Sequence, residues 1–187
     1  EPQHRGGAAA SWQVALRAAG SDGVLARYRS ELGADAMREL AGEEEARFWR
    51  CVSGFAGNVL ARHQNAMMVD LSLPIASVSD AVAAAERAAL DNNFLCAAVG
   101  RVGIGSLVMA FIPLLVDPPS AMLYANAVSD LRGALPRDAS AVVTRCPREC
   151  KVHFNLWGST PTDPDSMRAV KRALDPGNVL NRGRFVV

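Results

Sequence analysis

Three side chains in the C-terminal third of the chain are of types, and at a spacing, that occur in metal sites. Cys146 and Cys150 form a C-x3-C pair, and His153 follows closely. A structural zinc site needs four ligands, usually from two such pairs, and no second pair follows. We therefore expect free thiols and no metal. Cys51 and Cys96 lie among apolar neighbours, where we expect them to act as small core side chains.

The segment GRVGIG, residues 100–105, contains three glycines that could approach a phosphate. Its spacing differs from G-x-G-x-x-G, and an apolar strand pattern follows it, where a phosphate loop would lead into a helix. We expect a hairpin turn or bulge in which glycine supplies positive φ. Nucleotide binding at this segment is not predicted.

Acid–base and nucleophilic chemistry has no visible centre in the sequence. The histidines stand far apart, at positions 4, 63 and 153, outside any H-x-x-x-H or H-E-x-x-H setting and without an evident Ser, Cys or Asp partner. No Gly-x-Ser-x-Gly elbow is present. The carboxylates fall at turns and helix starts, where helix capping explains them. The residues alone therefore predict no self-contained active site.

Composition indicates an ordinary globular chain. Of 187 residues, 50% are hydrophobic and 21% charged, and the net charge is +1. Dispersed charges of both signs give no reason to expect nucleic acid or an anionic membrane as partner. The most apolar stretch, Gly103 to Val116, is too short to span a bilayer and contains Pro113. No secretory signal is visible. We expect a cytoplasmic protein, and the absence of an initial Met suggests a longer polypeptide.

The N-terminal part predicts a linker, one strand and two helices. Residues 1–10 are rich in Gly and Ala, and residues 12–17 alternate apolar and polar side chains as a half-buried strand does. Ser21 is placed to cap a helix that Gly33 closes. A second helix is expected from about Glu43 to Val52.

The central part alternates strand and helix patterns in a recognisable order. Residues 66–146 read β-α-β-β-α-β, which is the ferredoxin-like order of an α+β fold with two helices on one face of an antiparallel sheet. The expected strands are 66–74, 94–100, 106–112 and 139–146, and the expected helices are 78–90 and 118–135. A last helix begins at Asp163-Pro164, an N-cap followed by Pro at the first position. Residues 175–177, Asp-Pro-Gly, stop it.

The C-terminal tail resembles the signature of FAD-linked oxidases of the vanillyl-alcohol-oxidase type, K-x-x-x-DP-x-x-x-x-NPG-[RK]. The matching residues are Lys171, Asp175, Pro176, Asn181, Gly183 and Arg184. Arg182 replaces the usual proline, which loosens the corner and adds a charge. The preceding segment resembles the FAD-binding E subunit of glycolate oxidase, in which a pattern R-x-P is followed by W-G. Here Arg145, Pro147, Trp157 and Gly158 match that pattern. The early helix ending in Phe48-Trp49 also resembles that branch.

This resemblance implies a cap domain, covering residues 11–187, that shapes the substrate pocket of a flavoprotein. FAD would be held mainly by a separate domain, because this chain lacks the family's phosphate loop. The tail would return to that domain, with Asn181 and Arg184 as cofactor contacts and Arg145 as a weaker candidate for a substrate carboxylate. A role of the tail in helix packing alone remains an equal alternative.

The resemblance further implies oxidation of a small 2-hydroxy acid, glycolate or D-lactate, by hydride transfer to flavin. Partners would be the protein's own FAD domain and other glycolate-oxidase-type subunits, and this chain alone should be inactive. One alternative is a non-catalytic subunit or interaction module that does not bind FAD itself. A ferredoxin-like small-molecule sensor would explain residues 66–146 but not the tail.

Overall fold

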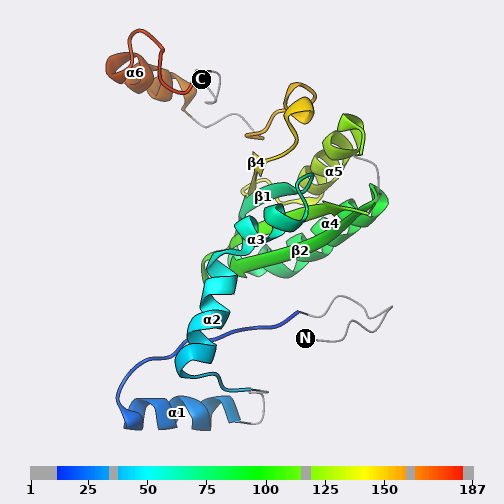
Figure 1. Ribbon diagram of the computed structural model, residues 1–187. Coiled ribbons are helices and arrows are strands. Elements are labelled where there is room, and N and C mark those ends of the chain that lie inside the picture. The colour runs from blue at the N-terminus through cyan, green and yellow to red at the C-terminus, as the bar shows by residue number, and fades with distance from the viewer. Residues whose placement is uncertain (1–11, 34–37, 115–118, 159–162, 183–187) are drawn as a thin grey trace. The chain divides into compact units, whose positions relative to one another are not determined.

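The computed structural model describes residues 12–33, 38–114, 119–158 and 163–182. The chain divides into two compact units, residues 1–47 and 48–187. Figure 1 shows its helices and strands. The first unit contains α1 (Asp22–Leu32) and the start of α2 (Gly42–Ser53), which ends in the second unit.

The helices of the first unit form where their end signals predict. α1 starts after Ser21, and Gly33 follows it with φ +50°. Residues 12–19 have no regular secondary structure, so the strand predicted at 12–17 is not found. Val14 is 95% exposed, which shows that the alternating pattern buries no face here. Apolar alternation identifies a possible buried face, but a strand also needs a hydrogen-bonded neighbour.

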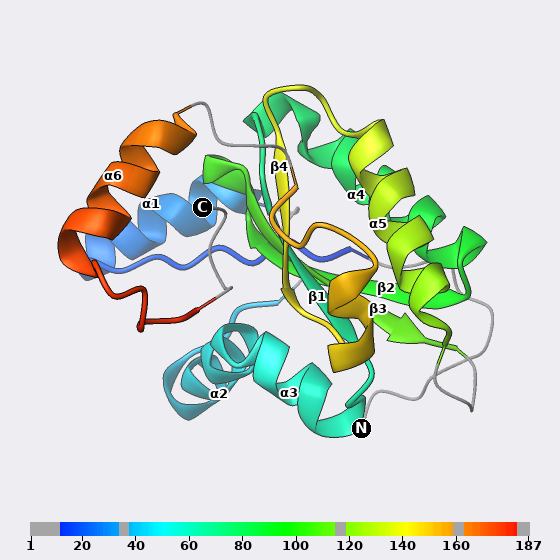
Figure 2. The same cartoon turned by 90° about the horizontal axis from the view of Figure 1, so that it is seen from above.

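The second unit is built on a four-stranded antiparallel sheet with strand order β2-β3-β1-β4. Two long helices connect the strands and lie on the same face of the sheet (Figure 2). The order of elements confirms the predicted ferredoxin-like α+β fold. The elements are β1 (Met67–Ser72), α4 (Val78–Asp91), β2 (Phe94–Arg101), β3 (Ser106–Pro113), α5 (Ala121–Ala134) and β4 (Ser140–Arg145).

The main core fills the space between this sheet and the helices α4 and α5. The ring of Phe94 contacts those of Phe111 and Tyr124, with centroid separations of 6.2 and 5.0 Å. The buried residues of α4 are Val78 and five alanines. Small side chains let the helix lie close to the sheet, and alanine also favours the helix itself. Tyr124 satisfies its buried hydroxyl by donating to the Asn65 carbonyl at 2.7 Å.

A tight turn joins β2 to β3 at the segment GRVGIG. Residues Val102–Ile104 form one 3-10 turn, and Gly105 has φ +63°. A Cβ at Gly105 would stand 1.8 Å from the Leu73 carbonyl oxygen. The segment is therefore the predicted hairpin connection, and glycine is required there by both backbone conformation and space.

A short helix that the sequence pattern did not reveal covers the opposite face of the sheet. α3 (Phe55–Arg62) packs Phe55 and Val59 against a second cluster that includes Met68 and Ala110. Eight residues containing Gly57 give a weak helical pattern, which explains why it was missed. The sheet therefore has helices on both faces. The side chains of one face belong to the main core, and those of the other face belong to the second cluster.

Candidate functional site

The C-terminal helix α6 (Pro164–Leu174) begins as its sequence predicts. The carboxylate of Asp163 accepts a hydrogen bond from the backbone N–H of Ser166 at 3.0 Å, and Pro164 occupies the first helical position. These contacts lower the pKa of Asp163. They satisfy a donor that the helix itself cannot pair, so they fix where α6 starts.

The chain that follows α6 is held by a buried carboxylate. Asp175 is 6% exposed, and its two oxygens accept the backbone N–H groups of Val179 and Leu180 at 2.9 and 3.0 Å. The Lys171 ammonium pairs with the same carboxylate and also donates to the Leu180 carbonyl at 2.9 Å. The bond from Lys171 is the main cause of the lowered pKa of Asp175. Lys171 and Asp175, two residues of the tail signature, thus hold the backbone of the tail at Val179 and Leu180.

Asn181 occupies the corner at which the described tail ends. Its φ is +48° and that of Asn178 is +47°, a left-handed conformation that Asn tolerates better than most residues. The Arg182 Nε donates to the Asn178 carbonyl at 3.0 Å, so the residue replacing proline adds a contact. Asn181 also lines an apolar groove of about 560 Å³ on α6. Arg184 lies outside the described residues.

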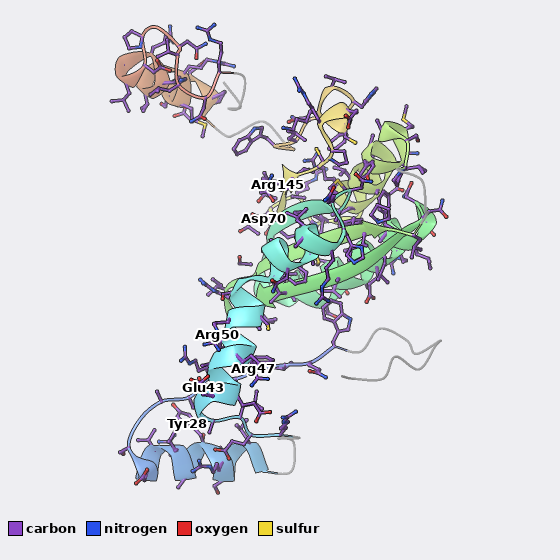
Figure 3. The ribbon with its side chains drawn as sticks, viewed as in Figure 1. Tyr28, Glu43, Arg47, Arg50, Asp70 and Arg145 are labelled. Carbon is purple, nitrogen blue, oxygen red and sulfur yellow. The ribbon has the colours of Figure 1, made fainter. Side chains whose placement is uncertain are left out.

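A second group of polar side chains lies where β4 meets β1. A bulge interrupts the pairing of these strands between Met68 and Val69, and Arg145 pairs with Met68. The Thr144 hydroxyl contacts the Met68 carbonyl and the Asp70 Oδ1, both at 3.4 Å. Bulges of this kind redirect side chains and are frequent beside active sites. Figure 3 shows Asp70 and Arg145 on these neighbouring strands.

Asp70 stands in an apolar part of this sheet face. Its partners across the two neighbouring strands are Val108 on β3 and Val142 on β4. Although Asp70 keeps contact with solvent, desolvation raises its pKa, and the bond from Thr144 acts in the opposite direction. Neither Asp70 nor Thr144 is predicted as a site residue by the sequence. The available signal was an aspartate in the middle of a strand, where this residue is depleted.

Arg145 borders a small pocket of about 250 Å³, shared with Leu60, Gln64, Ala66 and Cys146. Within the part of the chain that the structure describes, its side chain forms no hydrogen bond or ion pair. Arg145 is exposed. Five N–H donors in a planar fork are therefore available to a ligand, and carboxylates match that geometry.

Trp157 and Gly158, which belong to the sequence resemblance, lie in a turn closed by Asn155. The Asn155 side chain accepts from the Trp157 N–H at 2.9 Å and donates to the Gly158 carbonyl at 2.7 Å. The Arg132 guanidinium connects this turn to the sheet by donating to backbone carbonyls. Those carbonyls belong to Ala141, Asn155 and Leu156, at 2.7 to 3.1 Å. These matched residues therefore shape the backbone beside β4.

The four cysteines are free thiols. Cys96 and Cys150 pack in the core, and burial raises the pKa of Cys96 to about 12 and that of Cys150 to about 11. Cys51 is exposed, so its predicted core position is wrong, because the face of α2 that carries it is turned to solvent. Among the described residues, no three His, Cys, Asp or Glu side chains are placed to hold a metal ion.

The described residues include no glycine segment that leads into a helix and could bind the diphosphate of FAD. The glycine segment of the β2–β3 connection leads into a strand, so it offers no helix N-terminus to a diphosphate. Exposed side chains with hydrogen-bond donors in these two regions include Arg145, Thr144 and Asn181. This donor set suits a carboxylate or a carbonyl edge, and it would leave the FAD phosphates to another domain.

The fold and these sites define an α+β domain of ferredoxin-like topology with a C-terminal helix and a fastened tail. Residues 9–130 and 151–185 match the family described as FAD linked oxidases, C-terminal domain. The match covers most of the chain, which therefore belongs to this family. It includes the tail signature and Asp70, whereas Thr144 and Arg145 fall in its gap. No curated protein matches the chain. Within the described residues, no helix is long and apolar enough to cross a membrane.

Proposed function

We propose that this chain is the substrate-side cap domain of an FAD-dependent oxidoreductase that oxidises a small 2-hydroxy acid such as glycolate or D-lactate. Membership of the FAD-linked oxidase C-terminal family supports the flavin chemistry. The choice of substrate class rests on the sequence resemblance and on the guanidinium of Arg145, with which no described residue forms a hydrogen bond or ion pair. FAD would accept the hydride, and the protein would supply orientation and charge.

In this proposal the residues divide between substrate and cofactor. Arg145 binds the substrate carboxylate, since it is exposed and none of the described residues pairs with its donors. Asn181 and Arg184 contact the cofactor from the tail, which the Lys171–Asp175 pair holds in place. FAD is held mainly by another domain of the same protein, so this domain alone is inactive.

A substitution at Arg145 tests the substrate assignment. We expect Arg145→Met in the complete protein to raise the KM for glycolate or D-lactate about 100-fold, by removing a charge-assisted bidentate bond. Arg137→Met is the matched control, because Arg137 is exposed in the turn before β4. Equal KM values for the Arg145 variant and the wild type would exclude Arg145 as the carboxylate ligand.

A second candidate is a non-catalytic subunit that assembles with a separate catalytic chain, such as another glycolate-oxidase-type subunit. The exposed apolar side chains of α6 favour this second candidate, because Val170 and Leu174 are 59% and 79% exposed. Groups of exposed apolar side chains are common at protein interfaces. Purification of the complete protein with a tightly held partner but without flavin would support this candidate over the first.

A further inference from the structure

We propose that Asp70 is the base that takes the hydroxyl proton of the substrate while Arg145 holds its carboxylate, with Thr144 positioning the Asp70 carboxylate. This inference rests on the proposed function, and it assigns a catalytic residue that the sequence did not indicate. It follows from the bulged pairing of β1 with β4, which brings a carboxylate, a hydroxyl and a guanidinium to one part of the sheet.

The register of the sheet places Asp70 and Arg145 on the same face. Arg145 is directly opposite Met68 on β1, and paired residues of antiparallel strands share a face. Asp70 follows Met68 by two residues, so it points to that face as well. The bulge inserts Thr144 between the paired positions of β4, and the Thr144 hydroxyl reaches the Asp70 carboxylate at 3.4 Å.

The spacing suits a small 2-hydroxy acid. Diagonal neighbours across two antiparallel strands stand about 7–8 Å apart, within reach of long side chains. A carboxylate bound by Arg145 would place the hydroxyl of the adjacent carbon toward Asp70. Arg145 also borders a pocket of about 250 Å³ walled by Leu60 and Ala66, and Asp70 lies outside the lining of this pocket.

Few charges on this face compete with the assignment. The strand residues that share it carry two other charged groups, Arg145 at the end of β4 and Arg101 at the end of β2. β3 presents Ser106, Val108 and Ala110 to this face. α3 covers the other half with apolar side chains, and its one charged residue, Arg62, is exposed in its last turn. The desolvation that raises the Asp70 pKa moves this carboxylate toward the range in which a general base works best.

The proton and electron balance of the step is complete. The hydroxyl proton passes to the Asp70 carboxylate and the C–O bond becomes C=O, while the hydrogen on the α-carbon leaves with its electron pair, for which bound FAD would be the acceptor. The 2-hydroxy acid is oxidised to a 2-oxo acid, and FAD would take up the two electrons. Asp70 is exposed, so it can return its proton to water after the product leaves.

Binding of oxalate to the complete protein provides a test that does not depend on turnover. Oxalate carries the carboxylate of the substrate but cannot be oxidised in this way, and isothermal titration calorimetry measures its Kd. An ionised Asp70 repels it, so Asp70→Asn should bind oxalate about threefold to tenfold more tightly than the wild type at pH 7. Because the titration of oxalate itself affects both proteins equally, the two Kd values should converge as pH falls through the Asp70 pKa, and equal values at pH 7 would contradict the role of Asp70.

Anaerobic rapid mixing measures the rate of flavin reduction by the best 2-hydroxy acid. We expect Asp70→Asn to lower it by about 10²- to 10⁴-fold, the usual contribution of a general base. Thr144→Val removes a bond that lowers the Asp70 pKa, so the acid limb of its pH profile should move to higher pH. Asp138→Asn, in the exposed turn before β4, is the control that should match the wild type.

The outcomes separate this inference from the function on which it rests. Reduction of Asp70→Asn within about threefold of the wild-type rate, or an unmoved pH profile in Thr144→Val, would overturn the role of Asp70 and leave the oxidoreductase intact. A wild-type protein whose flavin no 2-hydroxy acid reduces and which does not bind oxalate would overturn both.

Discussion

Lys171 and Asp175 form an ion pair that joins the last turn of α6 to the chain following it. The same carboxylate accepts two backbone N–H groups, so Asp175 satisfies donors of a segment that has no secondary structure of its own. Two residues of the family signature therefore act on the backbone of the tail. Lys171 lies in the last turn of α6 and Asp175 caps its end, so the interval of four residues brings the ammonium to the carboxylate.

Replacing Asp175 should release the tail without unfolding the sheet. Asp175→Asn weakens the pair with Lys171 and leaves one oxygen to accept two N–H groups. We expect the amides of Val179 and Leu180 to lose protection from hydrogen exchange by about tenfold or more. Asp165→Asn, which removes an exposed ion pair with Arg168, is the control. Unchanged protection in Asp175→Asn would show that other contacts hold the tail.

The same contact should depend on pH in a defined direction. Because the pKa of Asp175 is below its ordinary value of 3.8, the folded tail favours the ionised carboxylate. Its stabilising effect is present above pH 3.8 and is lost as pH falls below 3.8 through the lowered pKa. Exchange of Leu180 followed from pH 6 to pH 2 in the wild type should show this loss, relative to amides of the core. A pH-independent ratio would contradict it.

Asp70 should behave oppositely, as a residue that lowers stability at neutral pH. Its folded pKa is raised, so the folded chain holds the proton more tightly than the unfolded chain. Stability from this residue is greatest below pH 3.8 and is lost as pH rises through the raised pKa. Asp70→Asn should therefore have a higher Tm than the wild type at pH 7, and the difference should shrink toward pH 4. A lower Tm at pH 7 would contradict this account.

Arg132 should be important for stability although it is partly exposed. Its guanidinium donates to three backbone carbonyls from β4 and the Asn155 turn, and burial lowers its pKa. Arg132→Met keeps much of the side-chain volume but removes these donors. We expect a loss of about 2 kcal/mol in the free energy of unfolding, measured by urea denaturation. Arg137→Met, an exposed control, should change it by less than about 0.5 kcal/mol.

Gly105 offers a sharp test of the β2–β3 connection. Gly105→Ala would bring a Cβ into the Leu73 carbonyl and force a left-handed backbone on alanine. We expect a loss of about 3 kcal/mol in the free energy of unfolding. At Gly103 a Cβ would meet open space, so Gly103→Ala is the matched control. A loss of stability in Gly105→Ala as small as that in Gly103→Ala would mean that the turn adapts to the added Cβ.

Much of the fold could be predicted from local signals. Alternation in residues 67–73 identified β1, and the Asp163-Pro164 pair identified the start of α6. These signals act within a few residues, so they can be read along the chain. α3 could not be predicted, because its stability comes from packing on Met68 and Ala110 of two different strands.

The candidate site was less accessible to prediction than the fold. Arg145 was proposed from resemblance, but its relation to Asp70 depends on strand register and on a bulge that places Thr144. Such features arise from pairing between residues about 75 positions apart, which no local pattern reports. The predicted strand at residues 12–17 shows the converse, because a correct alternation does not guarantee a partner strand.

The visible absorption spectrum of the complete protein, supplied with FAD, tests the central proposal most directly. We expect a flavin band that bleaches when glycolate or D-lactate is added without oxygen, since a 2-hydroxy acid would then transfer two electrons to the cofactor. Asp138→Asn should bleach at the same rate. A folded protein that holds no flavin, or a flavin band that neither acid bleaches, would contradict oxidation of these substrates by the protein that contains this domain.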